Sequence, residues 1–84
     1  MLANITVRYF AAAAAAAGRQ EETVELPVGA SFDDLTRHLA ARGPELERVL
    51  ARCSFLYDGV AVRDRSHRPE SGSVVDVLPP FAGG

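Results

Sequence analysis

The last seven residues, 78–84, combine residue types that could do chemistry at a chain end: Leu-Pro-Pro-Phe-Ala-Gly-Gly. Pro79 and Pro80 have no amide hydrogen for a strand ladder, so they predict that the last strand ends there and that the chain leaves it extended. Gly83 and Gly84 have no side chains, so they predict a thin segment that could enter a narrow channel. Such a segment would leave its terminal carbonyl open to attack.

A terminal carboxylate on Gly84 would need activation, because a carboxylate is a poor electrophile at neutral pH. Adenylation would convert it into a mixed anhydride, and a sulfur nucleophile could then displace AMP and leave a thiocarboxylate. Phe81 is expected to hold the tail at the mouth of a partner's channel, and Ala82 adds little volume. A frayed chain end would explain the glycines but neither the prolines nor Phe81. We therefore predict a domain at residues 1–78 and an extended, flexible tail at residues 79–84.

No catalytic site of the chain's own is expected from the remaining residues. The sequence has no paired carboxylates, no Ser/His/Asp arrangement and no glycine loop that could bind phosphate. Cys53 is the only cysteine and precedes an apolar run, which favours a buried structural thiol over a nucleophile. His38 and His67 lie too far apart in sequence for metal-ligand spacing. We expect no bound metal or cofactor.

Composition points to one small globular domain. The 84 residues are 48% hydrophobic and 24% charged, with a net charge of −2. All nine basic residues are arginine, and they form no strong basic patch, so neither nucleic acid nor membrane is an expected partner. The chain shows no signal-peptide pattern and no membrane-length apolar run, and we expect a cytoplasmic location. Without lysine, the chain cannot form lysine-linked chains with itself.

The elements that would carry the tail begin with a strand at residues 4–10, rich in β-branched and aromatic types. Its predicted core-facing residues are Ile5, Val7 and Tyr9. Phe10 falls on the opposite face. Seven alanines at 11–17, followed by Gly18, predict a short helix held by tertiary packing. Alternation at residues 22–26 predicts a second strand.

The main helix is predicted to start after Ser31, which can cap its free amides. The residues at helical spacing that should form its buried stripe are Phe32, Leu35 and Leu39. Gly43-Pro44 interrupts the helical pattern, and residues 46–50 predict one more short helix.

A hairpin and a final strand complete the pattern. Asp58-Gly59 between two apolar runs is typical of a type I′ turn, because glycine tolerates the positive φ that this turn needs. Residues 63–72 are predicted to form a loop, and residues 73–78 a last strand. This order of strands around one principal helix predicts an α+β fold with a helix packed on a sheet.

With these elements and this C-terminal segment, the chain resembles the MoaD/ThiS family of sulfur carriers, which are ubiquitin-like β-grasp proteins ending in Gly-Gly. The motifs that carry the resemblance are "VRYFA", Gly18, the cap at Ser31 and "VDVLPPFAGG". The Pro-Pro pair before Gly-Gly is more similar to the MoaD branch, whose members form the small subunit of molybdopterin synthase. The resemblance implies a mixed sheet packed on one main helix.

The resemblance also implies function and partners. A MoeB-like adenylating enzyme would use ATP and magnesium on Gly84, and a persulfide donor would leave the thiocarboxylate. The tail would then enter a MoaE-like large subunit, within a heterotetramer, and pass sulfur to cyclic pyranopterin monophosphate. The residues expected to contact these partners are Phe10, Ala61, Leu78, Pro79, Pro80, Phe81 and Ala82. Phe10 and Leu78 could instead form a second core layer beneath the alanine helix.

Three alternatives remain open from the sequence. The same tail could deliver sulfur for thiamin, cysteine or transfer RNA thiolation, because the partner selects the acceptor. The chain could be a ubiquitin-like modifier that is conjugated to lysines of other proteins. It could also be a β-grasp interaction module without tail chemistry, since a fold does not define a function.

Overall fold

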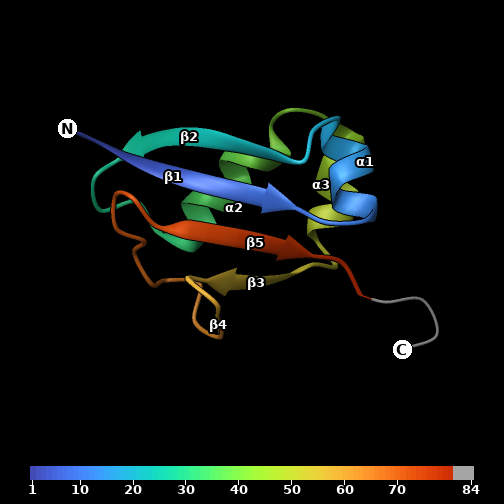
Figure 1. The fold of residues 1–84 in the computed structure, drawn as a ribbon. Coiled ribbons are helices and arrows are strands. Elements are labelled where there is room, and N and C mark those ends of the chain that lie inside the picture. The colour runs from blue at the N-terminus through green and yellow to red at the C-terminus, as the bar shows by residue number, and fades with distance from the viewer. Residues whose placement is uncertain (81–84) are drawn as a thin grey trace.

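A five-stranded sheet with helices on one side forms the part of the chain that the computed structural model describes, residues 1–80 (Figure 1). The elements in chain order are β1 Leu2–Tyr9, α1 Ala12–Ala17, β2 Glu21–Pro27, α2 Phe32–Ala40, α3 Pro44–Leu50, β3 Ser54–Tyr57, β4 Val60–Ala61 and β5 Val74–Leu78. The strands and helices predicted from the sequence are confirmed, with ends shifted by one or two residues. The first strand, for example, starts at Leu2 and ends at Tyr9, so Phe10 follows it.

The strand order is β2-β1-β5-β3-β4. β1 and β5 pair in parallel, whereas the other pairs are antiparallel. The predicted α+β fold with a mixed sheet is therefore confirmed. β5, the last strand in the sequence, lies in the middle of the sheet, so the segment at 79–84 leaves from a central strand.

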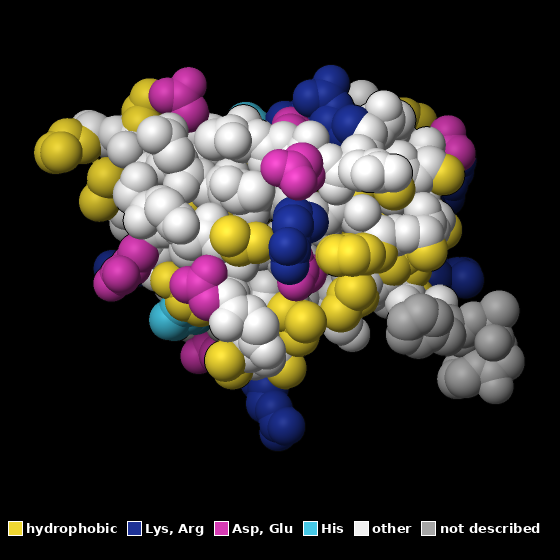
Figure 2. All heavy atoms as spheres, in the orientation of Figure 1, with side chains coloured by type: hydrophobic (Ala, Val, Ile, Leu, Met, Phe, Trp, Pro, Cys, Tyr) yellow, Lys and Arg dark blue, Asp and Glu magenta, His cyan; other side chains and the backbone are white. Residues whose placement is uncertain are grey.

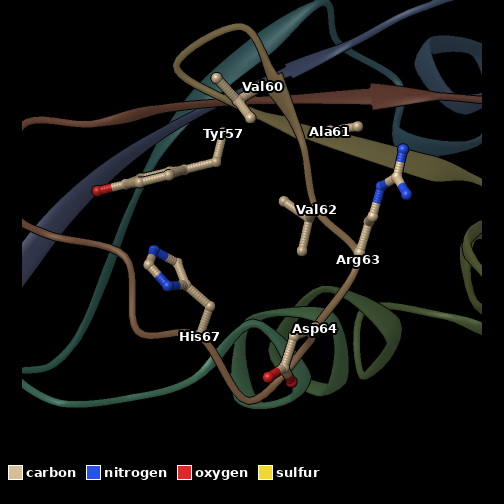
Figure 3. A pocket seen from close by; sticks show the side chains of 7 residues that line it. All are labelled: Tyr57, Val60, Ala61, Val62, Arg63, Asp64 and His67. Carbon is tan, nitrogen blue, oxygen red and sulfur yellow. The ribbon is translucent and has the colours of Figure 1, made fainter.

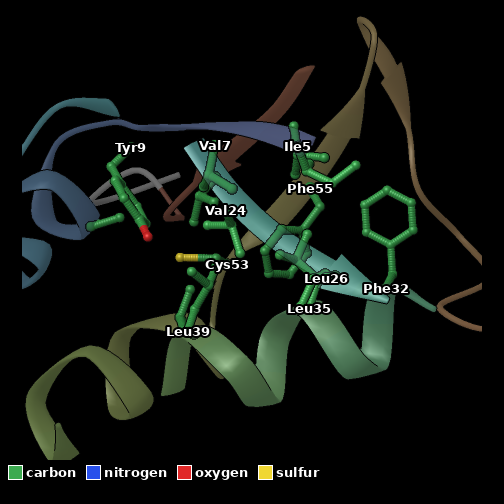
Figure 4. Packing of buried hydrophobic residues seen from close by; sticks show 14 of the residues in the cluster. Ile5, Val7, Tyr9, Val24, Leu26, Phe32, Leu35, Leu39, Cys53 and Phe55 are labelled. Carbon is green, nitrogen blue, oxygen red and sulfur yellow. The ribbon is translucent and has the colours of Figure 1, made fainter. Parts of the chain in front are cut away.

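The core lies between α2 and the inner face of the sheet (Figure 4). The predicted inward residues of the first strand are buried, and so are Val75 and Val77 of β5. Leu35 and Leu39 point from α2 toward the strands, and Phe32 closes one end of the layer. The spacing of apolar residues thus predicted which face of each element is buried.

The start of α2 is held by two sets of hydrogen bonds. The predicted cap at Ser31 is confirmed as a capping box: the Ser31 hydroxyl accepts from the Asp34 amide at 3.1 Å, and an Asp34 carboxylate oxygen accepts from the Ser31 amide at 3.0 Å. The loop after β4 adds carbonyls that the sequence did not predict. The amide of Phe32 donates to His67 at 2.9 Å, and that of Asp33 donates to Arg65 at 3.0 Å. These contacts pin the predicted loop onto the helix.

The alanine helix α1 packs at the end of the sheet where β1 and β5 finish, beside α3 (Figure 1). Ala13 is fully buried there, and Gly18 ends the helix with φ of 75° and an amide that donates to Ala14 at 2.9 Å. α1 therefore closes the end of the core. It does not cover Phe10, whose side chain is 41% exposed, so the alternative of a second core layer over Phe10 is wrong.

The predicted type I′ hairpin is confirmed by positive φ at both turn residues, 47° at Asp58 and 87° at Gly59. The Asp58 carboxylate also accepts a hydrogen bond from the Val74 amide at 2.8 Å, which ties the turn to the start of β5. Within residues 1–80, no helix has the length and apolar character needed to cross a membrane.

Candidate docking surface and tail exit

The tail leaves the sheet at the C-terminal end of β5. Pro79 is half-buried and Pro80 is exposed. The other residues predicted to act in the tail, Phe81, Ala82, Gly83 and Gly84, lie outside the described residues. Their roles, and the boundary between a domain at 1–78 and a tail at 79–84, stay predictions.

The open face of the sheet, on the side away from α2, carries an apolar surface next to the tail exit. We call its residues the outer patch: Phe10, Leu56, Ala61, Val74 and Leu78. Phe10 and Ala61 are exposed, and the other three are half-buried. Figure 2 shows hydrophobic side chains gathered over β1, β5 and β3 on this face. The structure thus brings together three of the predicted partner-binding residues: Phe10, Ala61 and Leu78.

An ion pair lies in the middle of the outer patch. Arg8 of β1 and Asp76 of β5 are register partners, and Arg8 donates from Nε to Oδ1 at 2.6 Å and from Nη2 to Oδ2 at 3.0 Å. The Asp76 side chain is only 11% exposed, whereas that of Arg8 is 48% exposed. The hydrogen bond to Asp76, followed by its charge, raises the pKa of Arg8 above its ordinary value. Arg8 and Asp76 alternate with the buried residues of their strands, but no pattern in the sequence indicates that the two side chains pair.

A second feature flanks the tail exit. A hollow of about 650 Å³ lies beside Pro79 and Pro80, and it includes the charged side chains Glu45, Arg48 and Arg52. Its remaining lining residues are Ala12, Val49 and Ala51. Arg48 lies on α3 and Arg52 lies in the turn after it, and no local pattern predicted that both would line the tail exit.

A smaller hollow of about 250 Å³ lies behind the hairpin and is lined by Tyr57, Val62 and His67 among others (Figure 3). The rings of Phe32, Tyr57 and His67 pack together there, with the His67 ring 5.1 Å from Tyr57 and 5.9 Å from Phe32. This ring cluster holds the loop at 63–72 against α2. His67 is thus part of the packing.

Cys53 is buried, and its thiol donates to the Val49 carbonyl at 3.1 Å. Burial raises the pKa of the thiol, which disfavours the reactive thiolate. The interpretation of Cys53 as a structural residue is confirmed. His38 is exposed on α2, and residues 1–80 contain no cluster of three side chains that could hold a metal ion.

The fold and the open face define the class of this protein: a ubiquitin-like β-grasp domain with an apolar surface beside the exit of its C-terminal segment. A scan against known families makes the assignment specific. The chain belongs to the ThiS family, which it matches over residues 7–84.

The relatives agree with this assignment. The chain is 36% identical over 82 residues to the molybdopterin synthase sulfur carrier subunit of Chlamydomonas reinhardtii, covering 96% of this chain and 99% of the relative. A solved structure described as molybdopterin converting factor subunit 1 of Pyrococcus furiosus is 29% identical, with a TM-score of 0.85 over 94% of this chain and 99% of that chain.

A third comparison concerns a complex. The chain is similar in fold to one chain of the complex of subunits 1 and 2 of the molybdopterin-converting factor from Helicobacter pylori. The TM-score is 0.66 and the identity 21%, over 96% of this chain and 99% of that chain, so this likeness shows the fold alone.

Proposed function

We propose that this protein is the sulfur carrier subunit of a molybdopterin synthase. The observation that carries the proposal is the 36% identity to a sulfur carrier subunit of that enzyme, which extends over nearly the full length of both chains. The Gly-Gly pair at 83–84 supplies the residue type that the proposed chemistry needs. Gly84 is adenylated, converted to a thiocarboxylate and donates its sulfur to cyclic pyranopterin monophosphate.

The chemistry balances without a catalytic group in this chain. The Gly84 carboxylate attacks the α-phosphorus of ATP and releases pyrophosphate. The outer sulfur of the donor's persulfide then displaces AMP and leaves an acyl disulfide. A second thiol of the donor or partner cleaves the S–S bond, so that the two thiols end as a disulfide and the thiocarboxylate is released. ATP and magnesium belong to the adenylating partner. Within residues 1–80, the charged side chains beside the tail exit are Glu45, Arg48 and Arg52, and Cys53 is buried, so we assign the activation chemistry to the partner.

Two partners act on the tail in this proposal: a MoeB-like adenylating enzyme and a MoaE-like large subunit, the latter within a heterotetramer located in the cytoplasm. Both need to place Gly84 in an active site, and we propose that both dock on the outer patch. The patch includes Leu78, which precedes Pro79, so a partner bound there would lie beside the exit of the tail. The complex of subunits 1 and 2 from Helicobacter pylori supports a two-subunit assembly for a protein of this fold.

The direct test is an intact mass measurement. The protein is incubated with ATP, magnesium, a persulfide source and a MoeB-like activator. We expect the mass to rise by the difference between one sulfur and one oxygen atom, with the change located at Gly84 by fragmentation. A variant without Gly84 is the control and should keep its mass.

A second reaction then identifies the acceptor. The thiocarboxylated protein, a MoaE-like subunit and cyclic pyranopterin monophosphate should yield molybdopterin and return the carrier to its original mass. No mass gain with an activator that modifies a known carrier would contradict sulfur loading. Loading without transfer to the pyranopterin would favour the thiamin, cysteine or transfer RNA alternatives, and amide-linked adducts on other proteins would favour a modifier.

A further inference from the structure

The Arg8–Asp76 pair occupies the middle of a row that crosses all five strands on the open face. Cross-strand partners in this row are Glu21, Arg8, Asp76, Leu56 and Ala61. Phe10 and Leu78 lie on the tail side of the pair, and Val74 lies on the other side. Any protein that covers the outer patch therefore also covers a guanidinium and a carboxylate.

The carboxylate of this pair is already satisfied, but the guanidinium is not. Both Asp76 oxygens accept from Arg8, and Asp76 as a residue is 8% exposed. A guanidinium has five N–H donors, and these two bonds use only the one on Nε and one of the two on Nη2. Within residues 1–80, Nη1 makes no side-chain hydrogen bond, and nearly half of the Arg8 side chain remains exposed.

Docking of a purely apolar partner face would bury these donors without acceptors. A buried unsatisfied donor is destabilising, and the penalty is larger when the group is charged. The partner must therefore place an oxygen acceptor opposite Arg8. Because Asp76 already neutralises Arg8 and Glu21 adds a nearby negative charge, a neutral oxygen fits this position better than a second carboxylate.

We propose that Arg8 determines partner selectivity on this surface by donating a hydrogen bond to a neutral oxygen, a main-chain carbonyl or side-chain amide, in an otherwise apolar partner face. Asp76 is the positioning residue, because its two bonds hold the guanidinium in the middle of the patch. The centroid of the Phe10 ring lies 6.0 Å from the guanidinium carbon and borders the same position. The inference rests on the proposed docking of the outer patch and names the chemistry of the partner at its centre.

The test compares binding of full-length variants to the MoaE-like large subunit by titration calorimetry. The double variant Arg8→Met/Asp76→Leu removes both charges and leaves neither ion unpaired, which keeps the fold stable. We expect it to bind about tenfold or more weakly than the natural protein, because a hydrogen bond to a charged donor is lost. Phe10→Ala should also weaken binding. Arg68→Met, which removes an exposed arginine of the loop at 63–72, should not.

The outcomes separate the possibilities. If the double variant binds as tightly as the natural protein or more tightly while Phe10→Ala weakens binding, the pair is only structural and the proposal is wrong. If neither changes binding, the outer patch is not the docking face and the proposal is equally wrong. The proposed function is tested separately, by the mass measurement of sulfur loading on Gly84, and does not depend on these binding results.

Two further measurements sharpen the test. Arg8→Lys keeps the charge but loses the paired donors, so it should bind more weakly than the natural protein even if the double variant fails to fold. If the acceptor is neutral, the affinity of the natural protein divided by that of the double variant should stay constant as the salt concentration is raised. A ratio that shrinks with salt would indicate a carboxylate on the partner and would overturn the neutral-oxygen assignment.

Discussion

The Glu22 side chain links three parts of the fold: β1, β2 and the turn after α2. It points to the inner side of the sheet opposite Val7, and its side chain is only 6% exposed. The Tyr9 hydroxyl donates to it at 2.6 Å, and Arg42 pairs with its other oxygen. Burial acts to raise the pKa of Glu22, but these hydrogen bonds outweigh burial, so the pKa lies below its ordinary value of 4.5.

Glu22→Gln should therefore lower the free energy of unfolding by about 1–3 kcal/mol near neutral pH, because it removes the charge that Arg42 and Tyr9 satisfy. A carboxyl with a lowered native pKa stabilises the fold above its unfolded pKa and loses this contribution as the pH falls through the native pKa. The difference between variant and natural protein should thus shrink below about pH 4.5. Urea unfolding of both proteins at several pH values measures this difference in the free energy of unfolding.

Glu25→Gln is the matched control, since Glu25 lies exposed on the same strand. A difference for Glu22→Gln that stays constant from neutral to acid pH would contradict the assigned role of its charge.

Residue-level prediction succeeded where burial follows periodicity and failed where distant charges meet. Val24 and Leu26, at alternate positions of the strand predicted over residues 22–26, are both buried, and the apolar run after Cys53 indicated a buried thiol. Alternation also places Glu22 on that inner face, where a charge is unexpected. Its partner Arg42 comes from the turn after α2, and no local pattern in the sequence reports such a contact.

Among the elements, α2 depends most on its first turn. Ser31→Ala should lower the free energy of unfolding by about 1 kcal/mol, because one orphan amide loses its acceptor and the reciprocal bond with Asp34 is weakened. Ser31→Asn should retain most of the stability, since asparagine is also a good N-cap. Thermal and urea unfolding measure both variants. Equal stability of the alanine and asparagine variants would show that the loop carbonyls alone satisfy the helix start.

The contact between those loop carbonyls and the start of α2 could not be predicted from the sequence. Strands, helices and the Asp58-Gly59 turn could be predicted because each has a side-chain signature in its own segment. The bonds from the amides of Phe32 and Asp33 to carbonyls of the loop at 63–72 involve only main-chain atoms. Such contacts leave no pattern of residue types, so the sequence did not indicate that the loop is bound to α2.

At the scale of the whole molecule, β5 connects two otherwise separate hairpins, β1–β2 and β3–β4. A chain ending at residue 72 should therefore lose cooperative unfolding, whereas a chain ending at Leu78 should unfold with nearly the stability of the full chain. Urea titration followed by circular dichroism compares the two. Marked destabilisation of the chain ending at Leu78 would contradict the predicted boundary between domain and tail.

The strand order itself could not be worked out from local patterns. Pairing of β5 with β1 joins residues nearly 70 positions apart, as in the bond between Arg8 and Asp76. Periodicity tells which face of a strand is buried but not which strands are neighbours. The resemblance to β-grasp proteins implied a mixed sheet and implied Phe10, Ala61 and Leu78 as partner contacts, but the order of the strands is known only from the structure.

The parallel pairing of β1 with β5 also has a mechanical consequence. Both strands run in the same direction, so the start of β1 and the end of β5 lie at opposite ends of the sheet (Figure 1). A force applied between these two points loads the hydrogen bonds along the β1–β5 ladder together, in shear, instead of opening them one after another. A partner that pulled on the C-terminal segment while the start of β1 was held would therefore act against the whole β1–β5 ladder at once.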